Sequence, residues 1–277
     1  MSMVCKMKRK IFLFLFICFY VNKLFCFSFY TKYEIDPGKE IELKTDGTAI
    51  ISDYEGNAIC KTRFTVNQYS KLCFISFLDE GVKYDNDPVK KVLLLGGKEI
   101  KSDSERNLAR GYYNTSSWFI VDVPRSMEGY DSYKDCTSYL KEGEKEYSID
   151  NLSEIRSDSP WVEGVEGYGE GEGFTIVGNK PYLLIVNGFI SVQKPYLYEQ
   201  NSRVKELKIT GSKSKKSKIL ELIDTPNFQT VDISFLEKDD DTIVQIHSVY
   251  AGTKYIDTCI SLCKLHNLPV IPYMGDK

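Results

Sequence analysis

The chain has 277 residues, a length that allows one large or two modest domains. Hydrophobic residues make up 42% of it and charged residues 27%, as in ordinary globular proteins, which argues against a disordered chain. The net charge of −3 leaves no basic surplus to neutralise a phosphate backbone, which argues against nucleic acid as a partner.

A basic segment followed by an apolar run opens the chain. Four Lys and Arg residues between positions 6 and 10 precede the apolar residues 11–20, and residues 24–27 continue the run. This is the pattern of a signal peptide, which we predict over residues 1–27, with export to the periplasm or the exterior. Because residues 22–23 are polar, the run is shorter than the ~20 apolar residues of a spanning helix. An uncleaved membrane anchor is the alternative.

The cysteines indicate neither a lipid anchor nor a disulfide framework. Cys26 follows Phe25, where a lipidation motif has a small residue, so we rank soluble export above lipid anchoring. The five cysteines after the signal segment are odd in number and irregularly spaced. Cys60 and Cys73 lie in neighbouring strand-like segments and are the one pair that we consider plausible.

Residues 33–123 alternate apolar and polar side chains in short segments closed by turn residues, which is typical of half-buried antiparallel strands. The expected strands are residues 40–43, 48–52, 59–66, 71–78, 90–95 and 117–123. We therefore predict a small antiparallel β domain over residues 28–145. Residues 125–158 are rich in Ser, Asp, Glu and Gly and are interpreted as a linker.

Short strands recur every 10 to 15 residues in the second half of the chain. They are expected at residues 173–177, 183–190, 204–210, 218–222, 229–233, 242–247 and 259–265. This number of short strands favours a jelly-roll sandwich. The whole chain is thus predicted to be all-β, with a second domain over residues 146–266 and a loose tail over residues 267–277.

Five runs carry a resemblance to a known family, and they follow one another in the order "SPWVEGVEGYGEGEGFTI", "LIVNGF", "NSRVKELKI", "ELIDTPNFQTVDI" and "HSVYAGTKYIDTCIS". Together they resemble the discoidin-like F5/8 type C domain, of galactose-binding fold, that is attached to NAD glycohydrolase toxins and to other exported bacterial proteins. The opening motif of that family is matched by Trp161, Glu163, Gly164, Gly167 and Gly169. The resemblance covers residues 146–266 and implies a jelly-roll sandwich.

The chain departs from the family pattern at three places. Phe174 stands where the family has Trp, which conserves an aromatic ring. Ile256 replaces an acidic residue in the run that leads to Cys259, so any function that needs that acid is in doubt. Residues 262–263, Leu and Cys, stand where the family has Glu and Ile.

The resemblance implies a non-catalytic module whose loops, at one end of a sandwich, recognise a glycan or glycoconjugate. Sugar sites combine aromatic faces with planar polar groups, and residues of these types lie near the expected loops. The candidate ligand-binding residues are Trp161, Asn187, Arg203, Lys254, Tyr255 and Asp257. A protein-interaction or structural module of the cell envelope, without sugar binding, is the alternative.

Each candidate also has a structural interpretation. Trp161 is favoured as a buried lid on the sandwich, because Trp is strongly buried on average. For Arg203 and Asp257, an ion pair between loop ends is at least as well supported as contact with a ligand. Asn187 and Gly188 together are typical of a turn.

No cofactor, nucleotide or metal is predicted. The Gly-rich loop of residues 163–173 carries four Glu residues, which repel phosphate, and no helix follows it. These acids and residues 239–241 could bind Ca²⁺, but we favour a solvated acidic turn. Cys259 and Cys263 are of zinc-ligand type, yet we expect them in the core, on one strand face that they share with Ser261.

No enzyme is predicted either. The two histidines, His247 and His266, lie in no recognisable nucleophile motif. Nothing in residues 1–150 resembles the catalytic domain of the toxins.

Overall fold

Strands dominate the computed structural model, which describes residues 32–36, 39–44, 46–53, 55–78, 83–84, 87–88, 91–99, 116–121, 131–153 and 158–272. The helical elements of these ranges are the 3-10 helix η1 (Ile149–Leu152) and the single-turn helix α3 (Leu197–Gln200). The all-β prediction is confirmed. The predicted signal peptide of residues 1–27 lies outside the described residues. Within the described ranges, no helix is long and apolar enough to cross a membrane.

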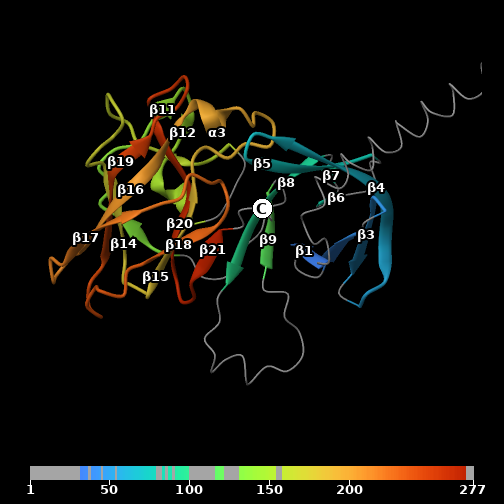
Figure 1. The fold of residues 1–277 in the computed structure, drawn as a ribbon, viewed down its shortest axis with the longest axis horizontal. Coiled ribbons are helices and arrows are strands. Elements are labelled where there is room, and N and C mark those ends of the chain that lie inside the picture. Colours follow the sequence, from blue (N-terminus) through green and yellow to red (C-terminus); the bar gives the residue numbers. More distant parts are fainter. Residues whose placement is uncertain are drawn as a thin grey trace, which may run out of the picture.

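The first region forms an eight-stranded antiparallel sheet in the order β1-β2-β3-β4-β5-β8-β21, with β9 paired to β8 (Figure 1). Its strands before the second region are β1 (Lys32–Asp36), β2 (Lys39–Leu43), β3 (Thr48–Asp53), β4 (Ala58–Tyr69), β5 (Leu72–Phe77), β8 (Lys91–Glu99) and β9 (Ser116–Val121), beside the separate pair β6 (Lys83–Tyr84) and β7 (Asp87–Pro88). The turn that joins β2 to β3 depends on Gly47, whose φ of +81° is a backbone conformation that few other residues adopt.

The proposed disulfide between Cys60 and Cys73 is wrong. Cys73 of β5 lies opposite Gln68 of β4, which is eight residues along that strand from Cys60. A strand rises about 3.3 Å per residue, so this separation is about 26 Å along the strand. A disulfide requires Cα atoms within about 7 Å of each other.

The second region forms a β-sandwich of nine strands whose path is β10-β14-β19-β16-β20-β15-β18, with β13 paired to β20 and β17 to β16. The strands are β10 (Tyr133–Lys134), β13 (Trp161–Val162), β14 (Gly173–Ile176), β15 (Tyr182–Asn187), β16 (Ser202–Gly211), β17 (Ser217–Glu221), β18 (Gln229–Asp232), β19 (Thr242–Tyr250) and β20 (Thr258–His266). A separate hairpin, β11 (Lys141–Glu142) and β12 (Lys145–Glu146), lies above them in Figure 1. The jelly-roll prediction is confirmed.

The sandwich core is filled by inward-facing residues from both halves of this path. Phe174 of β14 and Leu207 of β16 face Ile185 of β15 and Ile260 of β20 within one buried cluster. Trp161 packs in the same cluster, with its ring 5.2 Å from that of Phe174 in an edge-to-face arrangement. Alternation along each strand therefore produces the core that the sequence pattern predicts.

Strand β15 is buried on both faces, which explains its nearly continuous apolar sequence. Leu183 points into the sandwich core, whereas Leu184 and Val186 point the other way. The second face packs against Phe74 of β5 and Leu95 of β8, both in the first region. The two regions thus share a hydrophobic interface.

The end of the described chain joins the two regions. β21 (Val270–Pro272), which the sequence pattern leaves in a loose tail, pairs antiparallel with residues 97–99 of β8. Strand β10 pairs with β14, although it lies before the predicted start of the second domain at residue 146. Strand pairing therefore extends to residues before and after the predicted second domain of residues 146–266.

A bulge in β20 overturns the prediction that Cys259, Ser261 and Cys263 share one face. Opposite β15, Leu262 pairs with Val186 but Ile260 pairs with Asn187, so Ser261 is an extra residue in the ladder. As a result Cys263 lies in the sandwich core, whereas Cys259 packs in a different cluster with Tyr147 and Phe189.

Candidate functional site

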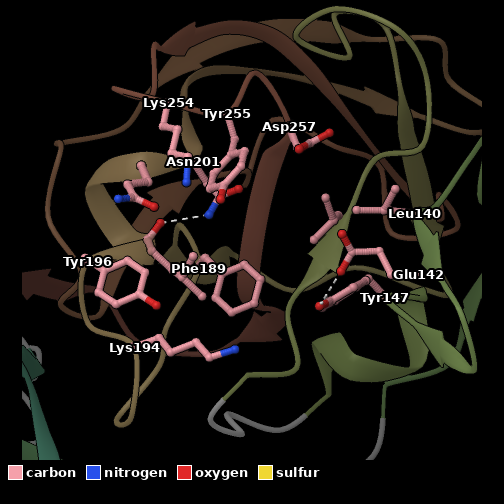
Figure 2. A pocket seen from close by; sticks show the side chains of 13 residues that line it. Leu140, Glu142, Tyr147, Phe189, Lys194, Tyr196, Asn201, Lys254, Tyr255 and Asp257 are labelled. Carbon is pink, nitrogen blue, oxygen red and sulfur yellow. Dashed lines mark hydrogen bonds between the residues drawn. The ribbon is translucent and has the colours of Figure 1, made fainter.

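The β11–β12 hairpin and α3 lie at the same end of the sandwich (Figure 1). A pocket of about 530 Å³ lies at this end (Figure 2). Four parts of the chain form it: the hairpin region of residues 140–147, Val162 of β13, the segment of residues 189–201, and the loop of residues 254–257 that leads into β20. The lining residues are Leu140, Glu142, Tyr147, Val162, Phe189, Lys194, Tyr196, Leu197, Gln200, Asn201, Lys254, Tyr255 and Asp257.

The hairpin wall places a carboxylate beside an aromatic ring. The Tyr147 hydroxyl donates a hydrogen bond of 3.2 Å to Oε2 of Glu142. The Tyr147 ring packs edge-to-face against Phe189 with 5.9 Å between ring centroids. Burial, and then the charge of Glu142, raise the pKa of Tyr147 to about 12, so its hydroxyl remains a hydrogen-bond donor at neutral pH.

The loop opposite is held to the end of α3 by backbone hydrogen bonds. The amides of Lys254 and Tyr255 both donate to the carbonyl of Gln200, at 3.1 and 2.7 Å, and the amide of Thr253 donates to the carbonyl of Glu199. Gly252 permits this close approach, because a Cβ there would lie 2.3 Å from the Gln200 carbonyl oxygen. The backbone therefore fixes the position from which Tyr255 and Asp257 enter the pocket.

Charges of both signs surround the pocket. Burial raises the pKa of Asp257, and the nearby charge of Glu142 raises it further. The ammonium of Lys254 lies 4.7 Å from the centre of the Tyr255 ring, and its hydrogen bond to that side chain raises the pKa of Lys254. Aromatic surfaces and hydrogen-bonding groups thus face one solvent-accessible space, which suits a polar ligand with flat apolar faces.

Three of the six predicted site residues meet in the pocket, namely Lys254, Tyr255 and Asp257. Trp161 does not, because it is 0% exposed and donates its indole N–H to the Ser138 carbonyl at 3.2 Å. Its interpretation as a buried lid replaces that of a sugar platform. Asn187 is also 0% exposed, and its side-chain amide bridges the backbone N–H and carbonyl of Val204.

Arg203 supports the pocket from behind and does not line it. Its guanidinium binds Asp224 through two hydrogen bonds of 2.8 and 3.1 Å, so the expected ion pair with Asp257 is wrong. Its Nη1 also donates to the carbonyls of Tyr198 and Asn201, at 3.3 and 3.0 Å. Arg203 thereby fixes the end of α3, next to the pocket wall.

Sequence reasoning missed the contribution of the hairpin. Glu142 and Tyr147 lie in a segment interpreted as linker, and the contact with Phe189 joins positions far apart in the chain. The available signal was the Gly143-Glu144 turn between short polar strands, which is typical of a hairpin. Lys194 and Tyr196 carried no comparable signal.

The acidic residues around the Gly-rich loop have structural roles where the structure shows their contacts. Glu163 is 0% exposed, and its carboxylate accepts hydrogen bonds from the amides of Val165 and Thr258, so it is not part of a solvated turn. Asp240 is 1% exposed and accepts from the amides of Lys213 and Ser214. No group of three His, Cys, Asp or Glu residues in the described ranges could hold a metal ion.

Comparison with known proteins identifies the domain that carries the pocket. The family described as NAD glycohydrolase translocation F5/8 type C domain matches residues 126–266. This match begins 20 residues before the predicted boundary and so includes β10 and the β11–β12 hairpin. No curated protein and no solved structure matches the chain. The chain, of which this β-sandwich is half, belongs to the NAD glycohydrolase translocation F5/8 type C domain family, whose domain is a binding module.

Proposed function

We propose that this protein is an exported, non-catalytic binding protein that recognises a glycan or glycoconjugate in the pocket between residues 140–147, 189–201 and 254–257. One observation carries the proposal: aromatic rings and planar polar groups face the same open space at one end of the sandwich (Figure 2). Sugars present flat C–H faces that stack on aromatic rings, and their hydroxyl groups hydrogen-bond to carboxylates and amides.

The exposed aromatic residues support this proposal. Tyr255 is 36% exposed and Tyr196 is 40% exposed, and both line the pocket. Between them and the hairpin, Phe189 and Tyr147 form a more buried aromatic floor. The polar groups of Glu142 and Asp257 lie at the edge of this floor, where they can orient a bound ring.

Protein binding without a sugar site is the second candidate. It is favoured by the apolar face of β15, which packs Leu184 and Val186 against Phe74 of the first region. That packing shows the domain in contact with another protein surface within the same chain. The pocket lies at a different place, so the two candidate functions can be tested separately.

The full chain on a broad glycan array tests the proposal, with Tyr255→Ala and Asp257→Asn beside the wild type. Tyr168→Ala is the matched control, because Tyr168 is 40% exposed and does not line the pocket. We expect binding that both pocket variants lose and the control keeps, with the bound glycan recovered chemically unchanged. A blank array from folded protein would favour the protein-binding candidate, and a processed glycan would contradict the non-catalytic assignment.

A further inference from the structure

Four charged side chains line the pocket without neutralising one another. Glu142, Asp257, Lys194 and Lys254 form no ion pair with any described residue. This contrasts with Lys141 and Glu146 on the same hairpin, which pair at 2.7 Å. Charged groups that surround an apolar floor and form no ion pair are available to a charged ligand.

The two signs are separated across the pocket. In the view of Figure 2, Glu142 of the hairpin and Asp257 of the loop opposite lie to the right, and Lys194 and Lys254 lie to the left. Lys254 lies over the ring of Tyr255, which keeps its ammonium on its own side. The carboxylate side is therefore the negative end of the pocket.

The carboxylate side is also lined by aromatic rings. Tyr147 donates its hydroxyl to Glu142, so its ring lies beside that carboxylate, and Phe189 packs against the ring. The charge of Glu142 opposes ionisation of Asp257, and no described basic side chain forms an ion pair with either carboxyl group. A cation placed between them relieves this repulsion and gains attraction from both carboxylates and from the faces of the rings.

We infer that the ligand presents an ammonium group to Glu142 and Asp257, so that the preferred glycan carries a free amine rather than an N-acetylated or neutral substituent. This inference rests on the proposed glycan-binding function. The remainder of the ligand extends toward Lys194 and Lys254, which suit hydroxyl or anionic groups. Hydrogen bonds from the ammonium to both carboxylates would be charge-assisted, which makes the free amine the feature that the pocket recognises.

Oligomers of glucosamine and of N-acetylglucosamine, matched in length, test the inference, because they share a backbone and differ at the amine. Calorimetry on the full chain, at a pH where the amine is protonated, compares the wild type with Glu142→Gln and Asp257→Asn. Glu144→Gln is the control, because Glu144 is an exposed residue of the same hairpin that does not line the pocket. It changes the net charge by the same amount.

We expect the wild type and Glu144→Gln to bind the amine form at least about tenfold more tightly, and each pocket variant to lose most of that preference. Equal binding of both forms would overturn the inference and leave glycan recognition standing. The inference would also be overturned if Glu144→Gln reduced the preference for the amine form as much as Glu142→Gln does. That result would mean that the preference comes from non-specific charge attraction. Binding of neither form, together with a positive array for another glycan, overturns only the inference, whereas a blank array removes the proposed function as well.

Discussion

Arg203 and Asp224 form a two-point ion pair at the junction between the two regions of the chain, with Nε to Oδ1 at 2.8 Å and Nη2 to Oδ2 at 3.1 Å. Lys71, in the turn just before β5 of the first region, binds the same carboxylate at 2.7 Å. The other amino group of Arg203 holds the carbonyl of Asn201, which lines the pocket. One carboxylate thus connects the first region to the pocket wall.

Replacing Asp224 with Ala should destabilise the protein. Burial alone would raise the pKa of Asp224, but hydrogen bonds from Arg203 and Lys71 lower it overall, so the carboxylate is charged and paired in the folded state. Because the side chain of Arg203 is only 10% exposed, Asp224→Ala leaves a mostly buried charge without its partner. We expect a loss of about 3 kcal/mol in the free energy of unfolding, measured with urea. Glu237→Ala, which breaks the exposed pair with Lys216, should have little effect, and an equal loss there would contradict this account.

The first region should also stabilise the pocket loop through Lys71. In Lys71→Met, Asp224 loses the ammonium that binds its carboxylate and its carbonyl, and Asp224 is the residue that positions Arg203 against the end of α3. Ser70 still donates a hydrogen bond to Glu199 of α3. We expect faster hydrogen exchange at the amides of Lys254 and Tyr255, which bond to the last residue of α3. Lys216→Met removes an ammonium from a distant surface pair and serves as the control. Unchanged exchange at these amides in Lys71→Met would show that the pocket is independent of the first region.

Gly252→Ala should destabilise the protein more than a Gly→Ala substitution at a position that only strains the backbone. The added Cβ would lie 2.3 Å from the carbonyl oxygen of Gln200 and 2.5 Å from that of Tyr255, so the loop must move away from α3. At Gly178, with φ of +82° and no neighbour within 4 Å, Ala introduces backbone strain alone. We expect a cost of about 1 kcal/mol at Gly178 and a clearly larger one at Gly252 in thermal unfolding. Similar costs would indicate that the loop moves freely.

The fold was largely predictable because both regions follow the two-residue period of strands. The expected segment 242–247 is observed as β19 (Thr242–Tyr250), and 204–210 as β16 (Ser202–Gly211). Prediction failed where this period is broken or where partners are distant. The extra residue Ser261, held by Gly188 and Ile190, turns Cys259 away from the face of Cys263, and no local pattern announces such a bulge.

The site was predictable only in part, for a related reason. Lys254, Tyr255 and Asp257 were found because they are close in sequence and belong to one loop. Arg203 has the residue type of a ligand contact, but its buried position depends on Asp224, which lies 21 residues away in another of the five family runs. Residue type identifies candidates, whereas tertiary packing decides which of them are exposed.

Asp257 should make the protein less stable as the pH rises. Burial, and then Glu142, raise its pKa in the folded state, so the folded protein holds this proton when the unfolded chain has already released it. The contribution of Asp257 to the free energy of unfolding is therefore at its full value below the ordinary Asp pKa of about 3.9. It is lost as the pH rises through the higher pKa that Asp257 has in the folded state. Asp257→Asn is expected to be more stable than the wild type at neutral pH, with a difference that disappears in acid. Urea unfolding over a pH series measures this, with the exposed Asp239→Asn as the control. A variant that is less stable than the wild type at neutral pH would mean that the Asp257 carboxylate has a favourable partner in the folded protein, and that the pocket does not need a cation from its ligand.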